Sequence, residues 1–191
     1  MAALNPVYTV GHSTRTVAEF VALLQAGNVQ LVVDIRSFPR SRTNPQFNLD
    51  ALPDALAPWQ LDSASLPQLG GRRGKSHSVP PDVNGFWINA SFHNYADYAL
   101  SAEFNQGFKS LESLSQERSC AIMCSEALWW RCHRRIVADY LLYRGYPVFH
   151  LMGKADVKPA AINGAAIARG GALVYPAQKS VCSTEREETR A

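Results

Sequence analysis

The sequence has no long hydrophobic run, and this absence argues against a membrane protein. No uninterrupted apolar segment approaches the roughly 20 residues that a transmembrane helix needs. The first residues, MAALNPVYTV, lack the charged start and the long apolar middle of a signal peptide. We therefore expect no membrane partner and a cytoplasmic location.

The sequence also lacks a strong excess of charge. The formal net charge of +3 and the isoelectric point near 8.7 permit an anionic ligand but fall short of the basic bias of a dedicated nucleic-acid binder. There is no internal repeat and no low-complexity tract. With 191 residues, 47% of them hydrophobic, the chain can form one sizeable core. We expect a single domain over residues 1–191, with its core at about 7–153 and a frayed tail at 184–191.

Cysteine is scarce, with four residues in the chain: Cys120, Cys124, Cys132 and Cys182. Four thiols are enough for two disulfides, but a reducing compartment favours free thiols, metal ligands or catalytic groups. We therefore expect all four cysteines to be reduced.

Strand-like and helix-like patterns alternate along the chain. Short apolar runs rich in β-branched residues are typical of strands buried on both faces of a parallel sheet. Such runs fall at residues 8–10, 31–36, 120–124, 148–151 and 172–175, and helical patterns follow Thr16 and cover about 48–56, 95–114 and 136–141. We expect Gly27, in a left-handed conformation, and Gly145 to end two of these helices. The alternation predicts an α/β fold: a single three-layer domain with a mostly parallel sheet flanked by helices.

Residues 72–94 interrupt this alternation with a stretch rich in Gly, Pro, Arg, Lys, Ser and Asn. A long irregular connection inside a compact domain is usually a lid, a binding loop or a disordered segment. We expect a lid that is mobile in the absence of ligand.

Polar side chains occur at the ends of three predicted strands. They are His12 and Ser13 after the first strand, Asp34, Arg36 and Arg40 at the end of the second, and Cys124 and Glu126 at the end of the strand at 120–124. Ligands of open α/β sheets bind at the carboxyl ends of strands, where helix N-termini also point. We therefore expect these side chains to form one pocket.

The densest group of reactive side chains lies between Cys124 and Arg134. Cys132 stands at or just before a predicted helix start, where the helix dipole and neighbouring cations would stabilise a thiolate. We expect Cys132 to be a nucleophile, a redox thiol or a metal ligand, with Glu126 or His133 as acid or base. For Cys124, simple packing and a functional role are equally compatible with the sequence.

The expected roles fall into three groups. Catalytic roles are expected for Cys132, Glu126, His133, His12 and Asp34. Anion binding is expected for Arg36, Arg40, Arg134 and Ser13, because guanidinium groups offer forked donors to phosphate or carboxylate. A zinc or iron site is a minority interpretation, since Cys-x7-Cys-His is not a standard structural spacing; its ligands would be Cys124, Cys132 and His133. The sequence identifies no cofactor.

Six motifs occur in order between about Tyr8 and Leu151. They are VGHS (10–13), VDIRSFP (33–39), NPQF (44–47), LPQLGG (66–71), YADY (95–98), and CSE (124–126) followed by CHR (132–134). Together they resemble the domain of unknown function 488 family. The resemblance implies a small bacterial-type α/β domain with a polar pocket, but no particular activity. It matches polar family positions to His12, Asp34, Arg36, Glu126, Cys132, His133 and Arg134. The chain departs from the family pattern at 128–130 and 73–94. These departures affect the expected identity of the substrate more than the expected position of the site.

Three hypotheses about function follow. The first is an enzyme, a cysteine-dependent hydrolase or transferase, that acts on a phosphorylated or nucleotide-like small anion. The second is a non-catalytic module that binds a nucleotide or nucleic acid through its arginine-bearing loops and tryptophans. The third is a metal-binding protein that uses cysteine and histidine. The sequence does not indicate the oligomeric state.

Overall fold

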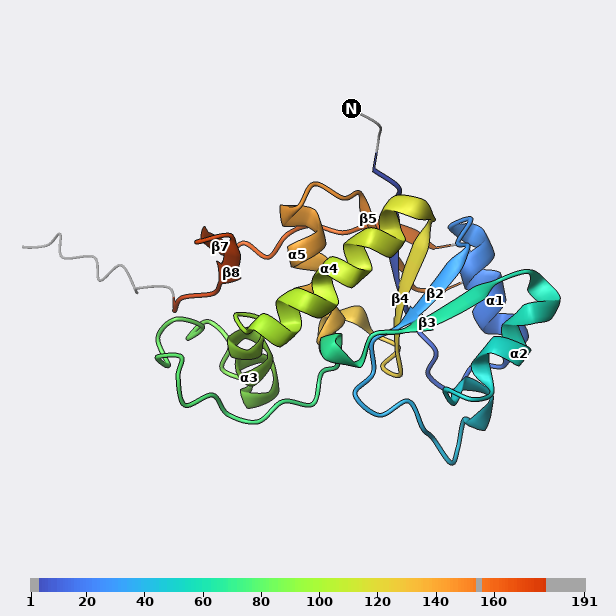
Figure 1. Ribbon diagram of the computed structural model, residues 1–191, viewed down its shortest axis with the longest axis horizontal. Coiled ribbons are helices and arrows are strands. Elements are labelled where there is room, and N and C mark those ends of the chain that lie inside the picture. Colours follow the sequence, from blue (N-terminus) through green and yellow to red (C-terminus); the bar gives the residue numbers. More distant parts are fainter. Residues whose placement is uncertain (1–3, 154–155, 178–191) are drawn as a thin grey trace, which may run out of the picture.

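A six-stranded, mostly parallel sheet forms the centre of the molecule (Figure 1). The computed structural model describes residues 4–153 and 156–177, so Cys182 and the tail at 184–191 lie outside the described residues. The strands are β1 (Val7–Gly11), β2 (Leu31–Asp34), β3 (Asp62–Ser65), β4 (Cys120–Cys124), β5 (Val148–Leu151) and β6 (Val157–Pro159), in the order β3-β2-β4-β1-β5-β6. Only the pairing of β5 with β6 is antiparallel among these neighbours. The predicted α/β fold is confirmed.

Helices cover both faces of the sheet and complete three layers (Figure 1). On one face lie α1 (Val17–Ala26) and α2 (Leu52–Leu56), and on the other lie α3 (Ala90–Tyr98), α4 (Ala102–Glu117) and α5 (Arg134–Tyr143). Successive strand residues serve opposite faces: Val32 packs in the core with α1 and α2, and Val33 in the core with α3, α4 and α5. The central strands are therefore apolar throughout. None of the described helices is long and apolar enough to span a membrane.

Local sequence signals explain where two helices begin and end. The Thr16 hydroxyl accepts a hydrogen bond from the Glu19 N–H, and the Glu19 carboxylate accepts one from the Thr16 N–H, so a capping box starts α1. Gly145 follows α5 with a φ of 87°, in agreement with its predicted role. Gly27 differs from the prediction, because its φ is −99°. Asn28 takes the left-handed conformation instead (φ 50°), which asparagine tolerates better than most residues.

The sequence pattern does not indicate three of the short strands. β3 has the sequence Asp-Ser-Ala-Ser, which lacks apolar alternation. It is a strand because its backbone pairs with β2 at the edge of the sheet. β6 is likewise an edge strand. β7 (Ile167–Arg169) pairs with β8 (Ala172–Val174) in a separate antiparallel sheet, and β8 corresponds to the strand predicted at 172–175.

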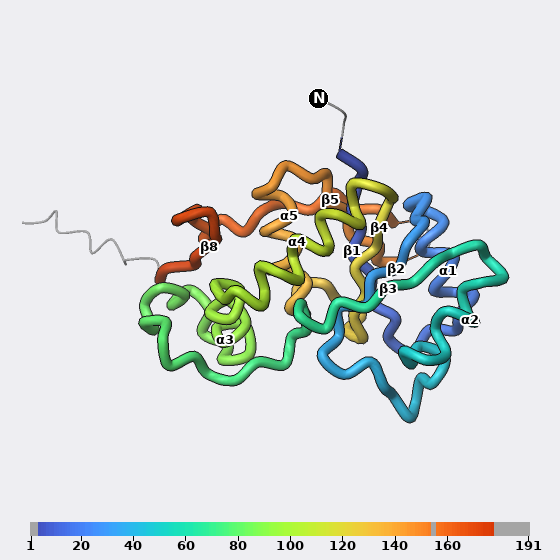
Figure 2. The backbone as a smooth tube through the Cα atoms, in the orientation of Figure 1, coloured from blue at the N-terminus to red at the C-terminus, as the bar shows by residue number. Residues whose placement is uncertain are grey.

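The predicted lid is an irregular connection between β3 and α3 (Figure 2). It is shorter than predicted, because the Asn89 side chain caps α3 and the helix begins directly after it. The end of the connection next to α3 is anchored, since Asn84 and Trp87 are buried. The Asn84 side chain donates to Asp97 and accepts from the Tyr175 N–H. The end of the connection next to α3 is thus packed against the protein, and the mobility of the remainder stays a prediction.

Candidate functional site

The carboxyl ends of β1, β2 and β4 meet at one edge of the sheet. β4 lies between β2 and β1, and backbone hydrogen bonds continue past the strand ends. The His12 N–H donates to the Cys124 carbonyl, and the Ile35 N–H donates to the Met123 carbonyl. The polar residues at these three strand ends are therefore neighbours in space, which makes this edge the candidate site.

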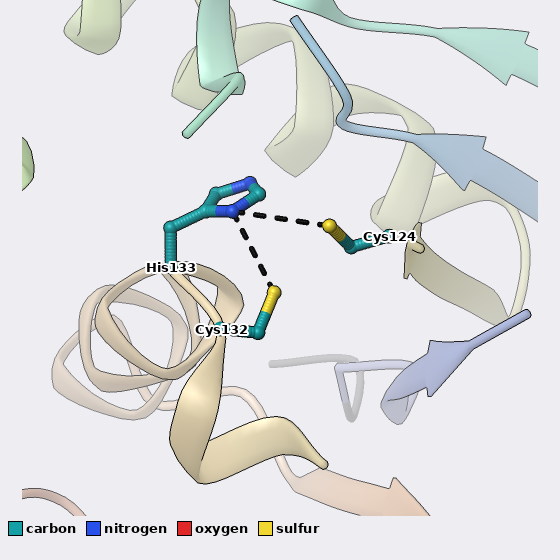
Figure 3. A group of neighbouring side chains, drawn as sticks. All are labelled: Cys124, Cys132 and His133. Atoms are coloured by element: carbon teal, nitrogen blue, oxygen red, sulfur yellow. Dashed lines mark hydrogen bonds between the residues drawn. The ribbon is translucent and has the colours of Figure 1, made fainter. Parts of the chain in front are cut away.

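Two thiols and one imidazole converge at this edge (Figure 3). Nδ1 of His133 lies 3.9 Å from Sγ of Cys124 and 3.5 Å from Sγ of Cys132. The three atoms all lie within 4.8 Å of one another, and both thiols are free and almost fully buried. Cys124 ends β4, whereas Cys132 and His133 directly precede α5. We call these three residues the Cys–Cys–His cluster.

The imidazole of His133 is held in one orientation. Its Nε2 lies 3.1 Å from the Ile35 carbonyl oxygen, and because a carbonyl can only accept, Nε2 carries a proton. Tyr95 packs edge-on against the ring, with 5.0 Å between centroids, and its hydroxyl donates to the Leu69 carbonyl. Gly71 lies against the ring, where a β-carbon would be too close. Nδ1 consequently faces the two sulfur atoms.

The two thiols differ in their electrostatic surroundings. A hydrogen bond from the Cys132 thiol, and with it the Glu126 N–H, lowers the pKa of Cys124 well below its ordinary value. Burial and the adjacent Cys124 sulfur raise the pKa of Cys132 well above its ordinary value. The structure therefore favours Cys124 as the thiolate, whereas the sequence favours Cys132. Burial beside a second sulfur outweighs the position of Cys132 at a helix start.

Two cavities open beside the cluster. The larger, of about 540 Å³, is bordered by the cluster itself and by Glu126, Arg36, Arg72 and Arg131, among others. The smaller, of about 380 Å³, is bordered by residues that include His12, Ser13 and Arg40. Arg36, Phe38, Arg72 and Ser125 border both cavities, so the two spaces adjoin.

Arg36 is largely committed to contacts within the protein. Its Nε and Nη2 donate to the Asp34 carboxylate, and Nη2 also donates to the Phe47 carbonyl. Nη1 donates to Nε2 of His12, so four of the five guanidinium N–H groups are engaged. Asp34 is 1% exposed and borders neither of these cavities. Asp34 thus orients Arg36 and neutralises its charge, and Arg36 keeps one N–H for a ligand; the catalytic role expected for Asp34 stays a prediction.

Both ring nitrogens of His12 are engaged. Nδ1 lies 2.9 Å from the Ser13 carbonyl oxygen and carries the proton, which leaves Nε2 to accept from Arg36. The ring stacks on Phe47 with 4.5 Å between centroids, and burial lowers the pKa of His12. A neutral His12 that positions Arg36 fits these contacts better than the predicted catalytic role.

Arg134 borders neither of the two cavities, in contrast to its predicted role in anion binding. Its side chain is 1% exposed and donates to the carbonyl oxygens of Glu126, at 2.6 Å, and Ala127, at 2.9 Å. Gly11 makes room for the same loop, because a β-carbon at position 11 would lie 2.0 Å from the Glu126 carbonyl oxygen. Arg134 and Gly11 therefore position the loop that presents Glu126 to the larger cavity.

Two features of the site are missed by reasoning from residue types alone. The Ile35 carbonyl and the absence of a side chain at Gly71 set the orientation of His133, yet neither residue has reactive chemistry. The only signal in the sequence is that both residues fall inside the motifs VDIRSFP and LPQLGG.

The comparison with protein families agrees with the motif pattern. The family model described as domain of unknown function DUF488 matches residues 16–141, which include the whole Cys–Cys–His cluster. No curated protein and no solved structure matches the chain. Because the family model covers well over half of the 191 residues, the chain belongs to the family of domain of unknown function DUF488.

Proposed function

We propose that the protein is an enzyme that acts on an anionic small molecule in the larger cavity. The observation that carries this proposal is the position of the Cys–Cys–His cluster on the wall of a cavity that three arginines also border. Thiol and imidazole groups supply chemistry, whereas guanidinium groups supply anion binding. A site of both kinds within one cavity is typical of an enzyme.

The charge around the two cavities favours an anion. Arg72 and Arg131 border the larger cavity and Arg40 the smaller one, and all three are exposed. Within the described part of the chain, none of the three forms an ion pair. Among the described residues that border the larger cavity, Glu126 is the one carboxylate. The arginines are therefore available to a phosphate or carboxylate group.

The aromatic residues favour a ligand that carries a flat ring. Phe38, Phe92 and Trp130 border the larger cavity, and Phe38 and Trp130 are exposed. Arginines beside exposed rings suit a ligand with both an anionic group and a base, because every base offers a face for stacking. This combination supports a phosphorylated, nucleotide-like substrate.

The chemistry is centred on the cluster and on Glu126. Cys124, Cys132 and His133 form the reactive centre, and Glu126 transfers protons as the general acid or base, because its exposed carboxylate borders the same cavity. Arg72 and Arg131 hold the anionic group, and Arg36 adds its remaining N–H. The proposed reaction class is hydrolysis or group transfer.

The binding half of the proposal is tested with a panel of phosphate esters and nucleoside monophosphates against the full chain. We expect several of these anions to raise the melting temperature. Arg72→Ala should weaken their binding about tenfold, the effect of one lost charge-assisted hydrogen bond. Arg42→Ala is the matched control, because Arg42 is exposed nearby but borders neither cavity. No binding at millimolar concentration would rule the proposal out.

The catalytic half is tested by turnover of the compounds that bind. Glu126→Gln should lower turnover by about 100-fold or more with little change in binding, as expected when a general acid or base is lost. Binding without turnover in the wild-type protein would instead identify a non-catalytic nucleotide-binding module.

A further inference from the structure

The Cys–Cys–His cluster contains more ligand groups than a simple cysteine–histidine pair needs. Both sulfur atoms lie against the same Nδ1 atom, at 3.5 and 3.9 Å. A ring nitrogen has either one proton or one lone pair, so it cannot form two good hydrogen bonds at once. A single positive centre between the three atoms would satisfy all of them.

The orientation of His133 prepares its Nδ1 for such a centre. Because Nε2–H donates to the Ile35 carbonyl, the neutral imidazole has its lone pair on Nδ1. Histidines that bind metals usually donate their other N–H to a carbonyl or carboxylate in this way. Tyr95 and Gly71 keep the ring in place from outside the cluster.

The distances also fit a metal centre. With Zn–S bonds of about 2.3 Å and Zn–N bonds of about 2.05 Å, a tetrahedral site places the sulfur and nitrogen ligands roughly 3.6 Å apart. The two sulfur–nitrogen separations in the structure, 3.5 and 3.9 Å, lie close to this value, and the two sulfur atoms lie within 4.8 Å of each other (Figure 3). The thiolate and imidazole ligands select zinc over hard cations such as magnesium.

We propose that Cys124, Cys132 and His133 bind one zinc ion, with its fourth position open to the larger cavity. Two thiolates neutralise the charge of Zn²⁺. The bound ion would therefore offset the free-energy cost of burying two negatively charged sulfur atoms. All three ligands border the cavity, so a water molecule or substrate group reaches the open position. Three protein ligands and an open position are typical of catalytic zinc. The zinc site itself is argued independently of the proposed function; only the substrate that would approach the zinc is taken from that proposal.

The first experiment measures the metal content of the full chain, purified under reducing conditions without a metal-affinity tag. We expect about one zinc per chain in the wild-type protein, and a loss of most of it in Cys124→Ser, Cys132→Ser and His133→Asn. Cys120→Ser is the matched control, because Cys120 is also a buried free cysteine but lies at the start of β4. It should retain the metal. Equal loss in Cys120→Ser, or no zinc in the wild-type protein, would count against the site.

The second experiment needs no variant and so does not depend on whether a variant folds. Cobalt(II) is titrated into the metal-free wild-type protein. We expect the near-ultraviolet absorption of thiolate-bound cobalt and the visible bands of tetrahedral cobalt, both saturating at one equivalent and both reversed by zinc. Saturation without these bands, or no binding, would overturn the proposal.

The results separate the zinc site from the proposed enzyme function. Zinc at one equivalent in a protein that binds no anion would leave the zinc site standing and remove the proposed substrate. Anion binding and turnover in a protein that binds neither zinc nor cobalt would do the reverse, and would leave Cys124 as a metal-free thiolate.

Discussion

Gly71 lies directly against the imidazole of His133, so that a β-carbon at position 71 would come within 2.3 Å of Nδ1. The two residues are far apart in the chain, but the segment after β3 passes over the start of α5. The ring cannot move away easily, because its Nε2 is hydrogen-bonded to the Ile35 carbonyl and Tyr95 packs against it. Gly71 is therefore a positioning residue for the Cys–Cys–His cluster.

Gly71→Ala should displace the His133 ring and weaken zinc binding by about 10- to 100-fold, the range observed when residues that orient metal ligands are changed. The measurement is the zinc affinity from competition with a chelator. Gly74→Ala is the matched control, because a β-carbon there has no neighbour within 4 Å. Equal affinities in the two variants would show that His133 does not depend on Gly71.

Arg134→Lys should destabilise the fold by about 1–3 kcal/mol, because one ammonium group cannot reproduce the two hydrogen bonds to Glu126 and Ala127. Urea unfolding measures the free energy of unfolding. Arg131→Lys serves as the control, since Arg131 is exposed and surface changes usually alter stability by about 0.5 kcal/mol or less. If Arg134→Lys is as stable as this control, the loop does not depend on the guanidinium fork.

His150 should make stability decrease as the pH falls. Burial, and then the charge of Arg134, lowers the pKa of His150 to about 4, and its ring stacks on Trp129 and bonds to Thr9. Between about pH 6.5 and 4 the unfolded chain binds a proton here and the folded chain does not, so folding loses on the order of 2 kcal/mol across this window. His150→Gln does not titrate and should remove this contribution. Unchanged pH dependence in that variant would refute the assignment.

Asp139 should act in the opposite direction. Burial raises its pKa to about 6, against the opposing effects of the Asn163 N–H, the Tyr175 hydroxyl and Arg135. Between about pH 4 and 6 the folded chain keeps a proton that the unfolded chain has lost, so stability falls as the pH rises.

Asp139→Asn should therefore raise the free energy of unfolding at pH 7 by on the order of 2 kcal/mol, with little effect at pH 4. Asparagine has no charge to bury and can still accept from the Asn163 N–H. Unfolding titrations of the wild type and variant from pH 4 to 7 make the test. A variant that is less stable than the wild type at pH 7 would show that the Asp139 carboxylate contributes more through its contacts than its burial costs.

The placement of the site was predictable, because it depends on the order of the strands. A parallel sheet brings the carboxyl ends of its strands to one edge, so Gly11–Ser13, Asp34 and Cys124 were expected together. The roles of individual residues were less predictable. Asp34 and Arg134 carry reactive or charged groups, yet the structure buries them against Arg36 and against the loop carbonyls. Residue type does not reveal whether a charge faces a ligand or the protein.

The sequence by itself determined the α/β fold, most of its central strands and the family, because apolar periodicity, helix caps and motif order are local properties. The tertiary structure alone decided which thiol has the lowered pKa and which atom of His133 faces the sulfurs. The orientation of His133 depends on the Ile35 carbonyl and on Gly71, which reach the ring only after the sheet and the segment following β3 are packed. The pKa of each thiol depends on burial and on the other sulfur, which packing brings together. Contacts between residues so distant in the chain follow from packing, and no local pattern encodes them.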